Sequence, residues 1–495
     1  MRVTIDEMVA FCKRKGFVYS GSELYGGLAG IFDYGPNGVD MKNNIKKEWW
    51  KSHVQIRDDI VGIDGAIITH EGIWKASGHL SSFGDLMLIC SKCKNRERAD
   101  SFLETKLNKS FAGINSDEVN MLVTQNKIKC PKCKGIFEKC TDFNLMFPVM
   151  LGEGNKGYLR GETAQVIFND FQLVVNNSRL KLPFGIAQIG KAFRNEISPR
   201  NFLFRCREFE QMELEYFVDP KEKECPYIKG YLDFEVQVKT YDMNDHEWMK
   251  IKDILDQKLM HSWHAYWLVY ELKWFLDLGS NKENFRFRQH NKNELAHYST
   301  DCWDMEYNFP FGWKELEGIA DRSDYDLKQH REHSKKDLFI VDDFGKKLVP
   351  HVIAEPSLGV DRAFLVFMFE AYYYNKERDN IILKLHPKIA PYQIAVYPLV
   401  KKLSEETKLI YDELKQHFNC IYDESGSVGR RYARADEIGV PFCVAFDFDS
   451  NDDKKCTIRE RDSGKQIRVS IKELVLIFSG LICLGKNIRD YSEVF

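Results

Sequence analysis

The sequence contains no long apolar run. Its most hydrophobic stretch, AFLVFMFEAYYY, is interrupted by Glu370, and no run in the 495 residues approaches the roughly 20 apolar residues that cross a bilayer. The opening residues, MRVTIDEMVAFCKRKG, also lack the apolar core of a secretion signal. We therefore expect a cytoplasmic protein with no membrane partner.

An excess of charge of either sign is also missing. The chain has 71 Lys and Arg residues against 74 Asp and Glu, a formal net charge of −3. A nucleic-acid partner must therefore be held by local basic patches rather than by the overall charge. A hydrophobic content of 44% and a charged content of 29% are typical of a globular protein with a full core.

Internal repeats and low-complexity tracts are absent, so changes in composition are the guide to domains. Two prolines in KLHPKIAPYQIAVYPL mark a linker, and the strand-like and helix-like runs that alternate after it predict an α/β domain over 390–495. Before the linker, charged strands with a period of two predict an α+β domain over 1–389, built on an antiparallel sheet with one open face. Within it, the polar, cysteine-bearing stretch 88–145 and the stretch 219–300 look like insertions.

Thirteen cysteines in a chain without a secretion signal indicate reduced thiols or metal ligands rather than disulfides. The pairs CSKC and CPKC give the C-x₂-C spacing that suits tetrahedral zinc, with Cys90, Cys93, Cys130 and Cys133 as ligands. The 36 intervening residues exceed the usual ~15–20, so a redox pair or ordinary buried thiols remain alternatives. Cys140 is a substitute for one of the four.

A two-residue alternation runs through the segment 205–217. It predicts a strand with unlike faces, whose odd-numbered face carries Arg205, Arg207, Phe209, Gln211, Glu213, Glu215 and Phe217. The preceding GIAQIGKAFRNEI predicts its partner strand, and SPRNF the turn between them. GIAQIGKA also matches a phosphate-binding loop, but Ala192 replaces the hydroxyl residue that such a loop needs for Mg²⁺, which favours the strand.

The odd-numbered face presents chemical groups in an order that fits a nucleotide lying beside an amine. Guanidinium groups bind phosphate oxygens, an aromatic ring stacks on a purine, and carboxylates accept hydrogen bonds from an ammonium group. A surface strand with cross-strand salt bridges would explain the charges but not Phe209 among them. Scaffold salt bridges are our interpretation for Arg200, Glu208 and Glu215.

This hairpin resembles motif 2 of the class II aminoacyl-tRNA synthetases, over about 185–217, and is most similar to the homodimeric glycyl type. GIFDYGPNGVDMKNNIKKEWW resembles motif 1 (about 29–50), and EPSLGVDRAFLVF resembles motif 3 (about 352–370), a strand that runs into a helix. YLRGETAQ, NELAHYSTDCWDMEY and GWKELEGIADRSDYDL resemble further segments, with Gly161 where proline is usual. The resemblance covers nearly the whole chain in the expected order.

The resemblance implies a class II catalytic domain followed by an anticodon-binding domain, a homodimer formed through motif 1, and roles for individual residues. Arg194 and Arg362 would be catalytic. The implied ATP contacts are Arg194, Asn195, Glu196, Phe204, Arg205, Arg207, Phe209, Glu315, Leu316, Gly359 and Arg362, with Mg²⁺ beside Glu315. The implied glycine contacts are Arg98, Glu162, Gln211, Glu213, Glu355 and Ser357. The implied contacts of tRNA(Gly) are Arg430, Arg431 and Arg434, within GSVGRRYARADEIGVPF; a surface that only balances Asp436 and Glu437 is the rival interpretation.

The implied reaction joins glycine to tRNA through a glycyl-adenylate, without a protein nucleophile. Another class II synthetase of the prolyl, threonyl or histidyl type is an alternative, which Glu162, Glu213 and the Glu355–Ser357 pair disfavour. A non-catalytic, synthetase-like nucleic-acid-binding protein is a further alternative. It should have lost the phosphate-binding arginines, which this sequence keeps. Class I synthetases are disfavoured because no HIGH-like or KMSKS-like sequence occurs.

Overall fold

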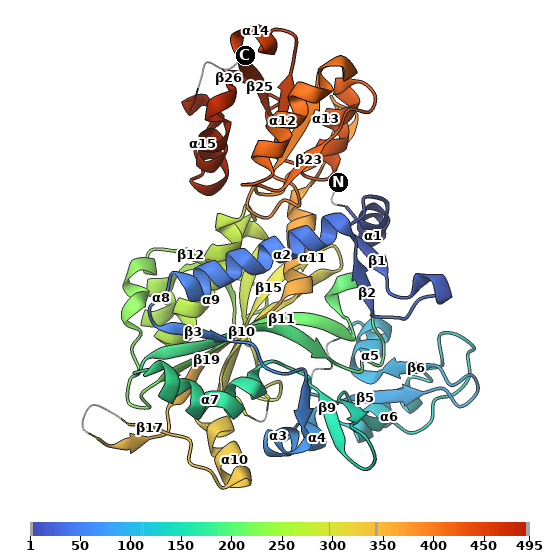
Figure 1. Ribbon diagram of the computed structural model, residues 1–495. Helices are drawn as coiled ribbons and strands as arrows, with labels where there is room; N and C mark the ends of the chain where they lie inside the picture. Colours follow the sequence, from blue (N-terminus) through green and yellow to red (C-terminus); the bar gives the residue numbers. More distant parts are fainter. Residues whose placement is uncertain (1–2, 110, 112, 297, 342–344, 492–495) are drawn as a thin grey trace.

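The computed structural model describes residues 3–109, 111, 113–296, 298–341 and 345–491. A large sheet flanked by helices occupies most of the molecule, and a smaller C-terminal unit stands at one end of it (Figure 1). None of the described helices combines the length and the apolar character that crossing a bilayer would require.

Across the described residues, nine strands form the central sheet. Their order is β13-β12-β14-β15-β16-β19-β11-β10-β3. Neighbours are antiparallel except β10 with β3 and β12 with β14, so the sheet is mixed rather than purely antiparallel as expected. The strands are β3 (Ile60–Ile63), β10 (Phe184–Phe193), β11 (Glu208–Val218), β12 (Glu235–Lys239), β13 (Glu247–Lys250), β14 (Phe285–Gln289), β15 (Asp301–Phe309), β16 (Gly312–Asp321) and β19 (His351–Gly359).

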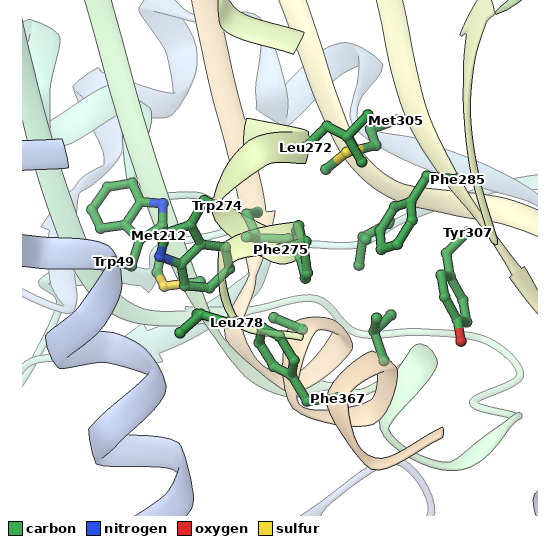
Figure 2. Packing of buried hydrophobic residues seen from close by; sticks show 14 of the residues in the cluster. Trp49, Met212, Leu272, Trp274, Phe275, Leu278, Phe285, Met305, Tyr307 and Phe367 are labelled. Atoms are coloured by element: carbon green, nitrogen blue, oxygen red, sulfur yellow. The ribbon is translucent and has the colours of Figure 1, made fainter. Parts of the chain in front are cut away.

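The main hydrophobic core lies on one face of this sheet. The even-numbered side chains Met212, Leu214 and Tyr216 of β11 are buried there against α2 (Pro36–Trp50), α9 (Ser262–Asp277) and α11 (Val360–Ala371). Figure 2 shows Trp274 and Phe275 of α9 among Trp49 of α2, Met212 and Phe367 of α11. Burying such aromatic side chains stabilises the fold by about 1.5–3 kcal/mol each, which fixes this face of the sheet as its interior.

A second core lies on the opposite face, under α7 (Ala164–Ser178) and α10 (Tyr325–Ser334). Phe184 stacks there on both Phe171 and Phe217. It covers only one end of β10 and β11, so the other end of this face remains open. The predicted hairpin of β10 and β11 is confirmed, with Phe184 opposite Phe217 and Phe193 opposite Glu208.

The segment 219–300, which looks like an insertion in the sequence, extends the central sheet. It supplies β12, β13, β14, α8 (Ile251–Asp256) and α9, and α9 contributes Trp263, Trp267 and Phe275 to the main core. A helix with so many large apolar side chains has to bury them, and the sheet is the available surface. Its predicted end is confirmed: Leu278 caps it, and Gly279 follows with a left-handed φ of 94°.

The cysteine-bearing stretch, in contrast, has its own small core. The strands β5 (Gly84–Ile89), β6 (Arg96–Arg98) and β7 (Thr141–Asn144) form a sheet with α5 (Ala99–Leu107) and α6 (Ser116–Gln125) packed on it. Leu88, Ala99, Phe102, Leu103 and Val119 are buried between them.

The C-terminal residues form a five-stranded sheet in the order β23-β22-β24-β25-β26, with a separate core. Its elements are β22 (Ile394–Pro398), α12 (Ser404–Leu414), β23 (Cys420–Tyr422), α13 (Val428–Glu437), β24 (Phe442–Phe446), α14 (Ser450–Asp453), β25 (Lys455–Glu460), β26 (Gln466–Ser470) and α15 (Leu474–Phe478). The predicted alternation of strands and helices is therefore present. The inner side of α13 contacts the large unit: Asn380 Nδ2 donates to the Ala433 carbonyl (3.1 Å), and Arg378 lies 3.3 Å from Asp436.

The remaining helices and strands lie outside the nine-stranded sheet, the five-stranded sheet and the sheet of β5, β6 and β7, and α1 adds Met8, Phe11 and Cys12 to the main core. They are α1 (Ile5–Arg14), β1 (Val18–Ser20), β2 (Phe32–Tyr34), β4 (Ile68–His70), α3 (Glu71–Ala76), α4 (His79–Ser82), β8 (Phe147–Met150), β9 (Lys156–Leu159), β17 (Ile340–Val341), β18 (Lys347–Leu348), β20 (Tyr372–Asn375) and β21 (Asn380–Leu383).

Candidate active site

A cavity of about 650 Å³ opens where the core leaves the sheet uncovered, between the β10–β11 hairpin, β15, β16, β19 and the cysteine-bearing unit. It brings together most of the residues that the sequence singled out. Those that line it are Arg98, Glu162, Arg194, Glu196, Phe204, Arg205, Phe209, Gln211, Glu213, Glu315, Glu355, Ser357, Gly359 and Arg362. Arg194 and Arg362 thus share one cavity.

Three predicted ATP contacts, Asn195, Arg207 and Leu316, do not line this cavity. Leu316 is a fully buried core side chain, and the Asn195 backbone N–H donates to the Leu145 carbonyl (2.8 Å). The Arg207 guanidinium donates to the carbonyls of Glu196 (2.9 Å) and Ala29 (3.1 Å).

The strand predicted to begin at Arg205 begins instead at Glu208, the first residue of β11. The predicted alternation is therefore wrong for the residues before it. A 3₁₀ turn at Phe202–Phe204 precedes the strand, with Asn201 in the left-handed region (φ 58°). The connection between the two strands is therefore longer than SPRNF. Arg205 and Arg207 lie in this connection, and of the two only Arg205 lines the cavity.

Arg194 is held between two aromatic rings. Its guanidinium carbon lies 5.2 Å from the centre of the Phe83 ring and 5.3 Å from that of Phe209, and its Nε donates to the Gly161 carbonyl (3.0 Å). A Cβ at position 161 would come within 3.0 Å of Met146 Sδ and 3.3 Å of Phe83. Glycine in place of proline therefore leaves room for the ring that holds Arg194.

Arg362 lies in the first turn of α11, directly after β19, as the sequence predicts. Its NH1 donates to the backbone carbonyl (2.9 Å) and to Oε1 (3.1 Å) of Glu315, and its guanidinium stacks over the Phe204 ring at 4.7 Å. The positive end of the α11 dipole adds to this charge.

Two further arginines are bound to carboxylates beside the cavity. Arg205 Nε donates to Glu196 (2.6 Å), while Arg98 contacts Asp85 (3.2 Å) and binds Asp100 through two nitrogens. Glu196 and Arg98 therefore shape the cavity wall around Arg205.

The opposite end of the cavity is lined by carboxylates. Glu213 accepts a hydrogen bond from the Ser357 hydroxyl (2.7 Å) and another from the Thr163 hydroxyl. Glu162 lies 3.2 Å from His79. Burial alone would raise the pKa of the Glu162 carboxyl, but His79 and Arg322 outweigh it and hold that pKa below its ordinary value.

Arg322 is a residue of this region that the sequence analysis missed. It is fully buried, and its NH1 donates to Glu355 Oε1 (2.7 Å). Its other nitrogens donate to Asp326 (2.8 and 2.9 Å). One sequence signal could have indicated the Arg322–Asp326 ion pair. Arg322 follows a strand and stands four residues before Asp326, at the start of a helix.

The four paired cysteines meet in space. The Sγ atoms of Cys90, Cys93, Cys130 and Cys133 lie within 4.8 Å of one another, with Cys90 and Cys133 at 3.5 Å and Cys93 and Cys130 at 3.6 Å. In both pairs the N–H of the residue after the second cysteine, Lys94 or Lys134, donates to the carbonyl of the first (3.0 Å). Four converging thiols with no other ligand type fit a tetrahedral zinc ion. Cys140 lies outside this group.

The three arginines predicted to bind tRNA differ on α13. Arg430 and Arg434 are exposed, and Arg434 donates to Asp423 (3.0 Å). Arg431 is buried and donates to the carbonyls of Pro398 and Gly426, so its assignment as an RNA contact is corrected to a structural role. A helix places positions three or four apart on one side, and the adjacent Arg431 points inward.

Comparisons with known proteins identify the family of this chain. A family model described as "Anticodon binding domain" matches residues 393–480. The glycine–tRNA ligase of Caldanaerobacter subterraneus subsp. tengcongensis is 47% identical over 487 residues, 96% of this chain and 97% of that protein. That of Acetivibrio thermocellus is 46% identical, over 97% of this chain and 99% of the relative.

A solved structure shows the same fold. The crystal structure described as the RNA binding domain of threonyl-tRNA synthetase from Cryptosporidium parvum matches 96% of this chain and 98% of its own, with a TM-score of 0.61 and 15% sequence identity. The fold is thus that of an aminoacyl-tRNA synthetase. With 46–47% identity to the two curated relatives over nearly its full length, the chain belongs to the glycine–tRNA ligase family.

Proposed function

We propose that this protein is a glycine–tRNA ligase of class II, which activates glycine with ATP and transfers it to the 3′ end of tRNA(Gly). One observation carries the proposal: a single cavity has arginines at one end and buried carboxylates beside a serine hydroxyl at the other. Those two ends match a triphosphate and an ammonium group, the charged parts of the two small substrates.

In the activation step the glycine carboxylate attacks the α-phosphorus of ATP, and pyrophosphate leaves. Arg194 binds the α-phosphate, Arg205 and Arg362 bind the outer phosphates, and Phe209 supports the adenine end. Mg²⁺, when bound, neutralises phosphate charge, and Glu315 is its candidate ligand. The residues act by holding the reacting groups in line and by stabilising the charge that develops, so no protein nucleophile is needed.

Glycine has no side chain, so the pocket must recognise its ammonium and carboxylate groups and exclude larger amino acids. Glu162, Glu213 and Glu355, with the Ser357 hydroxyl, provide acceptors for the ammonium group. Excluding a larger amino acid by steric contact is easier than rejecting a smaller one, for which a missing methylene changes binding by only ~1–3 kcal/mol. Because no amino acid is smaller than glycine, we expect no editing site.

In the transfer step a hydroxyl of the terminal tRNA ribose attacks the acyl carbonyl of the adenylate. We assign residues 1–389 to catalysis and 390–495 to anticodon binding, with exposed Arg430 and Arg434 on the RNA side. We further infer a homodimer formed through 29–50, a cytoplasmic location, and a structural zinc ion held by the four cysteines. The zinc would stabilise the cysteine-bearing unit and take no part in the reaction.

Amino-acid-dependent exchange of pyrophosphate into ATP, measured with a panel of amino acids, tests the proposal. We expect exchange with glycine alone. Arg194→Ala should reduce it at least about 10²-fold, as loss of a transition-state contact does, while the exposed Arg489→Ala leaves it unchanged. Exchange with proline, threonine or histidine would assign another substrate, and none with any amino acid would indicate a non-catalytic protein.

A further inference from the structure

Glu215 is a buried carboxyl group without a hydrogen-bond partner. It lies on β11 two residues after Glu213, has no exposed surface, and neither of its oxygens has a partner among the described residues. The scaffold salt bridge that we expected for it is therefore absent. Oxygens of Glu213, Glu215 and Glu355 lie within 4.8 Å of one another, so the unpartnered group lies directly behind two carboxylates that line the cavity, without lining it itself.

The charges around this group do not balance if every carboxyl is ionised. β11 contributes Glu213 and Glu215, and β19 contributes Glu355. The chain before α7 contributes Glu162, and α10 contributes Asp326. Against these five, the described residues place one guanidinium at their centre, Arg322, which is already bonded to Glu355 and Asp326. The other titratable or charged groups that face the cluster are His79, Arg160, Arg194, Tyr298, Cys302 and His330. Arg160 faces Glu213, but its guanidinium donates to the backbone carbonyls of Lys191 (2.6 Å) and Gly65 (2.7 Å).

Burial makes such an excess of negative charge unstable, because an ionised carboxylate without hydrogen bonds costs several kcal/mol. A carboxyl group in this position keeps a proton instead. Burial, reinforced by the charge of Glu355, raises the pKa of the Glu215 carboxyl well above its ordinary value. Burial also raises the pKa of Glu355 well above its ordinary value, with Glu213 adding to the effect despite Arg322.

We propose that Glu215 and Glu355 share a proton in the free enzyme and that the ammonium group of glycine replaces it. This inference rests on the proposed function. The O–H bond of the carboxyl breaks, its proton passes to the solvent, and the ammonium group keeps its three protons and takes over the charge balance. Glu215 is then a positioning residue, which holds Glu355 without touching glycine.

Isothermal titration of glycine in phosphate and in Tris, at about pH 7, tests this exchange. The two buffers differ in ionisation enthalpy, so the difference in binding enthalpy gives the number of protons released. We expect release of about 0.5–1 proton per glycine, and a dissociation constant that falls as the pH rises from about 6 to 8. Glu215→Gln, a neutral isostere, should still bind glycine but release fewer than about 0.2 protons.

Glu208→Gln is the matched control, since Glu208 lies on the same strand, is only partly buried and pairs with Lys191 (2.8 Å). It should release as many protons as the wild type. Glycine binding by the wild type without proton release, or equal release by Glu215→Gln, would overturn the inference and leave the proposed function intact. Absence of glycine binding would instead refute the proposed function. If Glu215→Gln does not fold, the wild-type proton count and its pH dependence decide alone.

Discussion

Lys42 lies 3.1 Å from Asp361, the residue that precedes Arg362 in α11. The same ammonium group lies 2.8 Å from Glu210 on β11, and Asp361 accepts a hydrogen bond from the Glu210 backbone N–H (2.8 Å). Lys42 is only 5% exposed. This buried network therefore joins α2, the helix of the 29–50 segment, to the strand and the helix that carry cavity residues.

Replacing Lys42 with methionine should leave the buried Asp361 carboxylate without its cation, while Glu210 keeps Lys46 (3.0 Å). We expect a loss of about 3–5 kcal/mol in the free energy of unfolding, as for other broken buried ion pairs, together with weaker ATP-dependent exchange because Arg362 loses its support. Urea denaturation and exchange assays measure the two effects. Lys47→Met on the exposed side of the same helix is the control. If the two variants had equal stability and equal exchange rates, the Lys42 network would contribute to neither.

The two kinds of arginine on α13 should separate in function. Arg431→Ala removes the donor to buried carbonyls and should lower the free energy of unfolding by about 2–4 kcal/mol. Arg430→Ala and Arg434→Ala should keep both stability and glycine-dependent exchange, while the KM for tRNA rises and its salt dependence weakens. Thermal unfolding and aminoacylation assays distinguish these outcomes. If both exposed variants charged tRNA as the wild type does, the prediction that α13 contacts RNA would be wrong.

The four converging cysteines predict that the protein contains zinc. The purified protein should contain about one equivalent of zinc, and less than about half an equivalent would count against the site. Cys133→Ser should lose the metal and unfold the cysteine-bearing unit locally, since that unit has only a small core. Metal analysis and proteolysis report these changes. The exposed Cys483→Ser is the control and should retain the zinc.

The raised pKa of Glu215 predicts how stability responds to pH. The unfolded chain ionises this group near pH 4.5, whereas the folded protein keeps the proton. Folding therefore takes up a proton above that pH, so the group's contribution to stability falls as pH rises towards its native pKa. Glu215→Gln removes this loss. From about pH 5 to 8, the Tm of Glu215→Gln should therefore rise relative to that of the wild type. The corresponding difference in the free energy of unfolding should grow by at most about 1.4 kcal/mol per pH unit. A constant difference across that range would mean that Glu215 is ionised in the native protein.

Local patterns in the sequence predicted much of the catalytic scaffold. Alternation from Phe209 onward identified the strand, because the pleat places every second side chain in the cavity or in the core. The strand-to-helix junction at Gly359 likewise placed Arg362. These features depend on neighbours within a few residues, which the sequence displays directly.

Features that depend on distant contacts were not predictable in this way. Arg207, which follows the 3₁₀ turn before β11, donates from its backbone N–H to the Gly30 carbonyl and from its guanidinium to the Ala29 carbonyl, both distant in the sequence. Arg322 joins the carboxylate end only because β16 and β19 pair. Likewise, an aromatic helix such as α9 shows from its sequence that it is buried, but not which sheet covers it.

The attachment of α13 to the large unit sets the distance between the exposed arginines of α13 and the candidate active site. Because Asn380 and Arg378 bond its inner side, α13 is attached to the large unit, which places its outward arginines at a defined distance from the arginine-lined end of the cavity. Under the proposed function this distance selects the tRNA by its shape. A nucleic acid of the wrong length or bend would reach either the arginines of α13 or the cavity, but not both at once.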